Sequence, residues 1–156
     1  MRLYMILMFF ILLLMSIWDI KCQKIPRGLI LSGFLVSGIR MIFLFMSEGP
    51  LAERLFLTCK ALLGALPGLI MVVLSYYTDK IGRGDGMVIT ITGLCEDFLF
   101  SMILVCMACI FMALPGAVML FCGKIGKNTR FPFVPFVMAS FIILKLLSIA
   151  KMGGIV

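Results

Sequence analysis

The chain has 156 residues, of which 63% are hydrophobic, and its formal net charge is +7. Soluble domains are usually about half apolar, so this composition excludes an ordinary soluble protein and favours one membrane-embedded domain, residues 1–156. Basic residues beside apolar segments ordinarily set the orientation of a membrane protein. We therefore interpret the positive charge as a topology signal and expect no nucleic-acid binding.

Apolar segments separated by polar residues predict an all-α polytopic membrane protein with about six transmembrane helices. In chain order, the expected spans are Leu3–Trp18, Leu29–Met46, Leu55–Tyr77, Met87–Cys95, Phe98–Cys122 and Phe133–Ile149. No small-residue cleavage site follows the first, so we expect a retained span and not a signal peptide. The fourth is too short to cross unless its ends extend into the flanking loops. Pro67 and Pro115, inside the third and fifth spans, are expected to kink their helices.

Lysine and arginine are unevenly divided between the two sides of this arrangement. One side carries Lys21, Lys24, Arg27, Lys80, Arg83, Lys124, Lys127 and Arg130, and the other carries Arg2, Arg54 and Lys151. The positive-inside rule therefore places the first group in the cytoplasm and both termini outside. Arg40, Lys60 and Lys145 fall within spans near their outer ends, where long side chains can reach the interface. We expect no catalytic role for these three.

Three aspartates, Asp19, Asp79 and Asp85, lie at the predicted cytoplasmic face of the membrane. The other acidic residues, Glu48, Glu53, Glu96 and Asp97, fall on the outer side. The chain has no histidine, which excludes Ser-His and Cys-His hydrolases in their usual form. Two neighbouring aspartates cannot both ionise easily, so one stays protonated while the other is a base, and the pair can activate water. Asp79 is more simply interpreted as a solvated helix end beside Lys80.

The segment KIGRGDGMVI surrounds Asp85 with three glycines, Gly82, Gly84 and Gly86. Glycine permits backbone conformations that are closed to other residues, and small residues let membrane helices approach closely. We expect these glycines to shape a site where a peptide backbone reaches the acid. The simpler alternative is a glycine-rich turn whose solvated aspartate caps a helix.

The six cysteines show no disulfide framework. Most lie inside apolar runs, where cysteine behaves as a small buried hydrophobe. Cys106 and Cys109 form a CxxC pair in mid-span, but a structural zinc site needs a fuller set of ligands, and no second pair accompanies them. We therefore expect no metal site here. Hydrolysis by a pair of aspartates would require neither a metal nor an organic cofactor.

Three segments follow one another along most of the chain: DIKCQKIPRGLI from Asp19, GRGDGMVI around Asp85, and RFPFVPFVMAS from Arg130. In order and spacing they resemble the D-x(6)-P-N-x-L, G-x-G-D-x-K-[LIM] and I-P-F-G-P-F segments of the type IV prepilin peptidase family. The resemblance implies a membrane aspartyl endopeptidase whose catalytic residues are Asp19 and Asp85. The chain departs from the family pattern at three positions, with Arg27 in place of asparagine, Met87 in place of lysine and Val134 in place of glycine.

The resemblance also implies a bacterial cytoplasmic (inner) membrane protein that acts at the cytoplasmic face. Its partners would be pilin-like precursors, each with a leader peptide and an apolar helix, and membrane lipids. The short first loop lacks the family's zinc-binding insert with methyltransferase activity, which implies the small, peptidase-only type associated with Flp/Tad-like pili. Pro26 and Pro132 are expected to start helices and Pro135 to lie in a first turn, with a substrate-lining role for PFVPF as the alternative.

Two other functions remain open on these residues alone. A small transporter could bind a proton or cation at membrane-edge acids, although such acids more often lie near the midplane. An inactive homologue could act in pilus assembly, which Arg27 and Met87 motivate. Lys80 or Arg83 could replace the missing lysine as the cation that keeps one carboxylate ionised.

Overall fold

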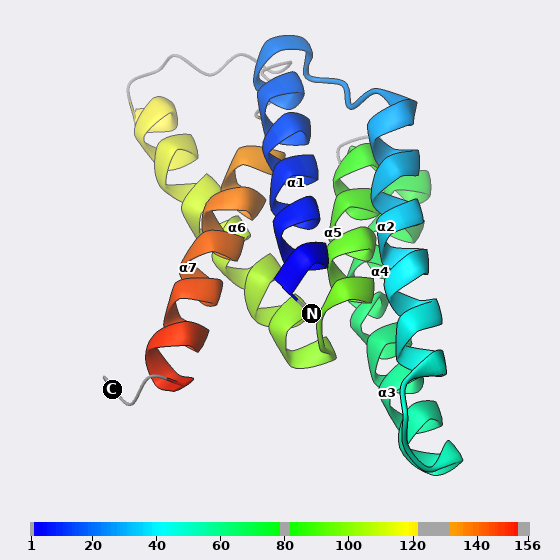
Figure 1. The fold of residues 1–156 in the computed structure, drawn as a ribbon. Helices are drawn as coiled ribbons and strands as arrows, with labels where there is room; N and C mark the ends of the chain where they lie inside the picture. The colour runs from blue at the N-terminus through cyan, green and yellow to red at the C-terminus, as the bar shows by residue number, and fades with distance from the viewer. Residues whose placement is uncertain (1, 79–81, 122–131, 153–156) are drawn as a thin grey trace.

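The structure is a computed structural model that describes residues 2–78, 82–121 and 132–152, and every regular element in these ranges is an α-helix (Figure 1). The helices are α1 (Arg2–Cys22), α2 (Arg27–Met46), α3 (Leu51–Gly64), α4 (Leu66–Tyr77), α5 (Arg83–Cys95), α6 (Phe98–Phe121) and α7 (Val134–Met152). In the described residues, five stretches are long and apolar enough to span a membrane: Tyr4–Cys22, Arg27–Met46, Leu51–Tyr77, Phe98–Met119 and Val134–Lys151. The prediction of an all-α polytopic membrane protein is confirmed.

The third and fourth predicted spans differ from the helices that form. The segment expected as Leu55–Tyr77 is two helices, α3 and α4, which meet at Ala65. Pro67 lies at the start of α4 and has no N–H to bond a carbonyl of the preceding turn, which explains the break. By contrast, α6 continues through Pro115. The segment expected as Met87–Cys95 belongs to α5, whose 13 residues are fewer than the roughly 20 that a crossing helix needs.

The short helix α5 is the centre of the bundle, with contacts to α2, α3, α4, α6 and α7. Its residues from Val88 to Gly93 are all buried. Because a helix that is apolar on every side needs neighbours on every side, α5 is enclosed by the spans and does not face lipid along its length. Its core partners include Met8, Leu12 and Met15 of α1 and Val134, Val137 and Phe141 of α7.

Small residues let α5 approach α3 and α4 closely. A Cβ atom on Gly64 would collide with the carbonyl oxygen of Gly93, and one on Gly68 would collide with the backbone nitrogen of Thr90. Nearer the start of α5, a Cβ atom on Gly86 would lie 2.7 Å from Cγ2 of Val72. This packing of small residues is the usual way in which membrane helices reach close contact, and it fixes the position of the first turn of α5.

Candidate active site

One end of the bundle, the upper end in Figure 1, is formed by the last turn of α1 and the first turns of α2, α5 and α7. Asp19 lies in the last turn of α1 and Asp85 in the first turn of α5. Asp19 is only 6% exposed, and Asp85 is partly buried. Two of the three aspartates expected at one membrane face therefore lie at the same end, while Asp79 lies outside the described residues.

The carboxylate of Asp19 is held by the start of α7. Its Oδ2 atom accepts a hydrogen bond from the backbone N–H of Val134 at 3.0 Å. Val134 is the first residue of α7, and an N–H in the first turn has no carbonyl partner within its own helix. Pro135 follows without an N–H, and the N–H of Phe136 bonds the carbonyl of Phe133 at 3.0 Å. Asp19 therefore caps α7 from another helix, where the helix dipole favours negative charge.

Asp85 lies outside the five possible spans, in the first turn of α5 and before the apolar run that starts at Met87. Burial and, second, the negative charge of Asp19 raise the pKa of Asp85 from 3.8 to about 7. Two carboxylates that interact in this way tend to share a single proton. Among the described residues, no lysine or arginine forms an ion pair with either aspartate. The arrangement thus combines a capped carboxylate with a carboxyl group that holds its proton near neutral pH.

The glycines around Asp85 serve close packing. A Cβ atom on Gly84 would lie 3.0 Å from Cδ1 of Ile25, so the loop after α1 touches the start of α5. A Cβ atom on Gly82 would lie 2.7 Å from Oδ2 of Asp85. The expectation of conformations closed to other residues is wrong, because Gly49 is the one glycine with positive φ in the described ranges. The expectation of close approach fits these contacts and those of Gly86.

The predicted prolines lie at or beside helix starts. Pro26 immediately precedes α2, and its carbonyl accepts the N–H of Leu29 at 3.0 Å. Pro132 lies two residues before α7, and Pro135 is the second residue of that helix. Val134, whose backbone N–H bonds Asp19, was not among the predicted site residues. The sequence did offer a signal: Val134 directly precedes Pro135 at a predicted helix start, where a backbone N–H needs a partner from outside the helix.

The three departures from the family pattern differ in their surroundings. Val134 is fully buried and contacts Asp19 through its backbone, so the side chain at this position is not what makes the hydrogen bond. Arg27 is exposed at the first residue of α2. Met87 is partly buried two residues after Asp85.

The cation suggested as a substitute for the missing lysine is engaged elsewhere. The guanidinium carbon of Arg83 lies 4.7 Å from the centre of the Tyr76 ring, a cation–π contact between α5 and α4. Lys80, the other candidate, lies outside the described residues. The raised pKa of Asp85 agrees with the lack of a cation bonded to it in the described parts of the chain.

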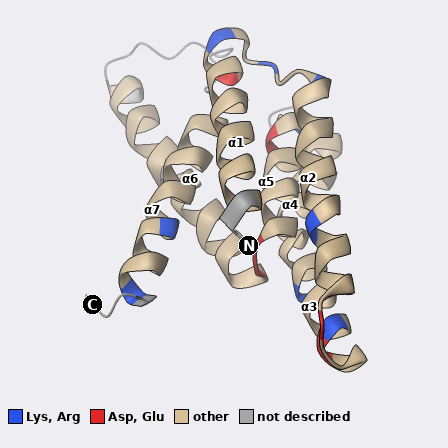
Figure 2. Ribbon diagram, in the orientation of Figure 1, with Lys and Arg blue, Asp and Glu red and all other residues tan. Residues whose placement is uncertain are grey.

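Arg40, Lys60 and Lys145, which were expected to extend to the membrane interface, have partners within the protein. Two of them form ion pairs, Lys145 with Glu96 at 2.6 Å and Lys60 with Asp97 at 2.8 Å. The third, Arg40, donates a hydrogen bond from Nη1 to the carbonyl oxygen of Leu94 at 2.8 Å. Glu96 and Asp97 connect α5 to α6 at the opposite, lower end of the bundle, and the ribbon between the charged ends is mostly uncharged (Figure 2).

Comparison with known proteins adds one match. Residues 6–117 match the model of a family described as the Type IV leader peptidase family. The matched range covers most of the chain, includes both Asp19 and Asp85, and ends before α7. No curated protein and no solved structure matches the chain.

Proposed function

Because the chain belongs to the type IV leader peptidase family, we propose that it is an aspartyl endopeptidase that removes the leader from pilin-like precursors. The whole chain acts as one membrane-embedded domain of the small, peptidase-only type. It lies in the bacterial inner membrane, and the junction between leader and apolar helix reaches Asp19 and Asp85 from the cytoplasmic face. This orientation rests on the distribution of lysine and arginine between the loops.

One observation carries the proposal: Asp19 and Asp85 lie at the same end of the bundle, where burial and, second, the charge of Asp19 raise the pKa of Asp85 to about 7. A pair of carboxyl groups with one shared proton provides an acid and a base at the same time near neutral pH. A single solvated aspartate that caps a helix would provide only a carboxylate. The interaction between the two therefore favours catalysis over the simpler interpretation of Asp85 as a helix cap.

The two aspartates take different roles because their surroundings differ. Asp19 is the base, since its carboxylate accepts the N–H of Val134 at the positive end of α7. Asp85 is the acid, because its raised pKa keeps it protonated up to about neutral pH. This division follows a general rule: where the surroundings of two carboxyl groups push their pKa values apart, one group acts as the acid and the other as the base.

Hydrolysis then needs only water and the two side chains. The water oxygen attacks the carbonyl carbon of the scissile bond while Asp19 takes a proton from the water. Asp85 gives its proton to the carbonyl oxygen, which forms a neutral tetrahedral intermediate. When the C–N bond breaks, the proton on Asp19 passes to the leaving nitrogen, and a hydroxyl of the intermediate returns its proton to Asp85. Both side chains end in their starting states, without a metal or organic cofactor.

The surrounding glycines and prolines hold this pair in place. Gly82 leaves room for the carboxyl group of Asp85, and Gly84 lets Ile25 and the loop before Pro26 pack beside it. Pro132 and Pro135 lie on either side of Val134, whose backbone N–H donates to Asp19. We therefore assign these residues a positioning role and no direct contact with the reacting atoms.

The test is leader removal from a co-expressed pilin-like precursor by Asp19→Asn and Asp85→Asn variants. Both substitutions keep the side-chain shape but remove the proton transfer, so we expect cleavage to fall by about 10³-fold or more. Asp97→Asn is the matched control, because Asp97 is exposed and pairs with Lys60 at the opposite end. Cleavage by Asp19→Asn or Asp85→Asn at the wild-type rate would contradict the assignment.

The same variants separate the two alternative functions. Ion flux in proteoliposomes that both substitutions abolish, without precursor cleavage by the wild type, would favour a transporter. Restored pilus assembly by Asp85→Asn would favour a non-catalytic assembly partner. Cleavage that depends on both aspartates excludes both alternatives.

A further inference from the structure

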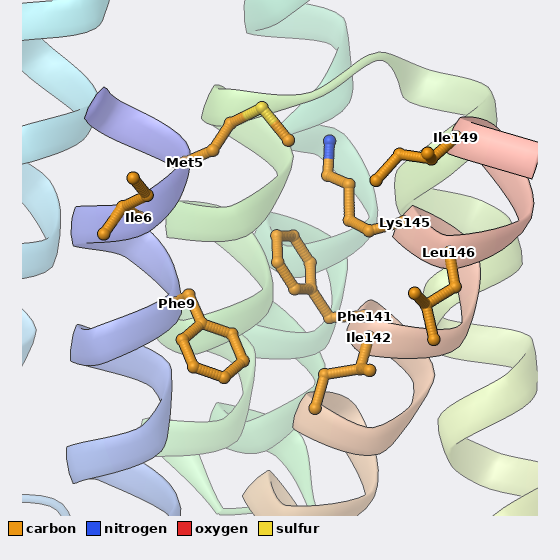
Figure 3. A pocket seen from close by; sticks show the side chains of 8 residues that line it. All are labelled: Met5, Ile6, Phe9, Phe141, Ile142, Lys145, Leu146 and Ile149. Carbon is orange, nitrogen blue, oxygen red and sulfur yellow. The ribbon is translucent and has the colours of Figure 1, made fainter. Parts of the chain in front are cut away.

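A groove with a volume of about 260 Å³ opens between α1 and α7 (Figure 3). Its walls include Met5, Ile6 and Phe9 from α1 and Phe141, Leu146 and Ile149 from α7. The exposed lining is apolar, because Lys145 contributes only its hydrocarbon stem and directs its ammonium group to Glu96. The groove therefore suits apolar side chains and offers nothing to a charged or polar group.

The two walls are the helices that hold the catalytic carboxylate. At the upper end, α1 and α7 are joined by the hydrogen bond between Asp19 and the N–H of Val134. Toward the lower end the two helices separate (Figure 1), and the groove lies in the part where they have separated. The groove therefore lies along the same two helices that meet at the Asp19–Val134 contact.

The distance along α1 matches the length of an apolar helix that starts at the scissile bond. Phe9 and Met5 precede Asp19 by 10 and 14 residues, which an α-helix covers in about 15 and 21 Å. A membrane-crossing helix has about 20 residues. A precursor helix that begins beside Asp19 and runs along α1 therefore passes the groove within its own length.

Resting on the proposed function, we propose that this groove receives apolar side chains of the precursor's helix, about 10–14 residues beyond the scissile bond. A helix about 10 Å across is too wide to enter such a groove whole, so its side chains enter while its backbone stays outside. The groove would hold the precursor's helix alongside α1, and the junction between leader and helix would then lie at Asp19 and Asp85.

A second hollow on the described surface provides the contrast. It measures about 270 Å³ and is lined by α2 alone, from Leu31 to Ile42. Because it has a single wall and shares neither helix with the Asp19–Val134 contact, it has the character of an ordinary lipid-facing surface. The groove between α1 and α7 differs in having two walls, both of which belong to helices that meet at the Asp19–Val134 contact.

Tryptophan substitutions that fill each hollow test the proposal. Ile6→Trp and Leu146→Trp fill the groove, and Ile39→Trp and Leu35→Trp are matched controls on α2. The replaced side chains have similar exposure, 52% and 62% in the groove and 53% and 60% on α2. Each variant is assayed in lipid vesicles with the full precursor and with a short peptide that spans the junction but lacks the helix.

We expect the groove variants to lose at least about tenfold more kcat/KM with the full precursor than with the short peptide. The α2 variants should keep the wild-type ratio between the two substrates. Equal losses on both substrates in the groove variants would overturn the proposal while leaving the peptidase function intact. If the wild type cleaves neither substrate, the proposed function itself fails, and this inference fails with it.

Photo-crosslinking provides a measurement that does not depend on a bulky substitution. A benzophenone amino acid replaces Leu146, or Leu35 as control, in the inactive Asp85→Asn chain in vesicles with the precursor. We expect a crosslink from position 146 to the precursor helix about 10–14 residues beyond the scissile bond. A crosslink only to lipid or to a second copy of this chain, or equal precursor crosslinking from position 35, would overturn the proposal.

Discussion

The two ends of the bundle hold their acidic residues in opposite ways. At the upper end, Asp19 and Asp85 have no ion-pair partner among the described residues, and Asp19 accepts a hydrogen bond from a backbone N–H. At the lower end, two neighbouring carboxylates each have a cation, Glu96 with Lys145 and Asp97 with Lys60. Within the described ranges, the acids where α5 meets α6 are paired with cations, and those near the start of α5 form no ion pair.

This difference separates charges that hold helices together from charges to which we assign a chemical role. The pair of Glu96 with Lys145 connects the end of α5 to α7, so it holds the central helix against a span. Asp85 forms no ion pair with any described residue, and its negative charge is opposed by burial and by Asp19. A carboxyl group kept at such a cost is a functional-site candidate by physical criteria alone.

Breaking the lower pair should have the largest effect on stability. The side chains of Glu96 and Lys145 are 14% and 18% exposed, so Glu96→Gln leaves a mostly buried ammonium group without its counter-charge. We expect the free energy of unfolding to fall by about 3 kcal/mol, with cleavage per folded molecule retained. Denaturant titration in detergent micelles measures the first, and precursor cleavage measures the second.

The adjacent pair is the control for this prediction. Lys60 and Asp97 are 45% and 52% exposed, so Asp97→Asn should cost no more than about 1 kcal/mol. Equal losses from Glu96→Gln and Asp97→Asn would remove the contrast between a buried structural pair and an exposed one.

At the upper end, Gly82→Ala should damage activity and leave stability nearly unchanged. The new Cβ would lie 2.7 Å from Oδ2 of Asp85, and the carboxyl group can turn away easily because it ends a side chain. We expect kcat/KM to fall by roughly 10- to 100-fold from this displacement. Gly28→Ala is the matched control, since nothing lies within 4 Å of its new Cβ. Equal activity of both variants would show that the position of Asp85 is not critical.

The pH profile of cleavage should show the proton on Asp85. Because the pKa of Asp85 is raised to about 7, the acid form is present below that pH and is lost as the pH rises through it. We expect kcat/KM for the short peptide to fall about tenfold per pH unit above neutrality. A rate that stays constant well into the alkaline range would contradict the role of Asp85 as the acid.

Local patterns in the sequence predicted much of the fold. The ends of α2 and α4, at Met46 and Tyr77, and the start of α6 at Phe98 coincide with the predicted spans. These limits are set by short-range signals, because polar residues, Gly or Pro border each of these helix ends. The existence and order of the helices therefore follow from hydropathy and helix-breaking residues.

The features that the sequence did not predict depend on contacts between distant residues. Asp19 and Val134 are 115 positions apart, so no local pattern relates the carboxylate to the helix start that it caps. Pro67 predicted a kink near this point, but not the division of the span into α3 and α4 at Ala65, because hydropathy stays high across the break. The ion pair of Lys145 with Glu96 was not predicted either, because it also joins residues that are far apart in the sequence and meet only in the packed bundle.

The most direct test is the unfolding free energy of Asp85→Asn and wild type as a function of pH, measured beside cleavage. The folded pKa of Asp85, about 7, exceeds its ordinary value of 3.8, so ionisation lowers wild-type stability as the pH rises between these values. Asparagine does not ionise. We predict that Asp85→Asn loses cleavage and gains stability over wild type from about pH 4 to pH 7, with a constant advantage above neutrality. Retained cleavage, or a variant that is less stable than wild type at about pH 8, would contradict the claim that Asp85 is kept for chemistry at the expense of stability.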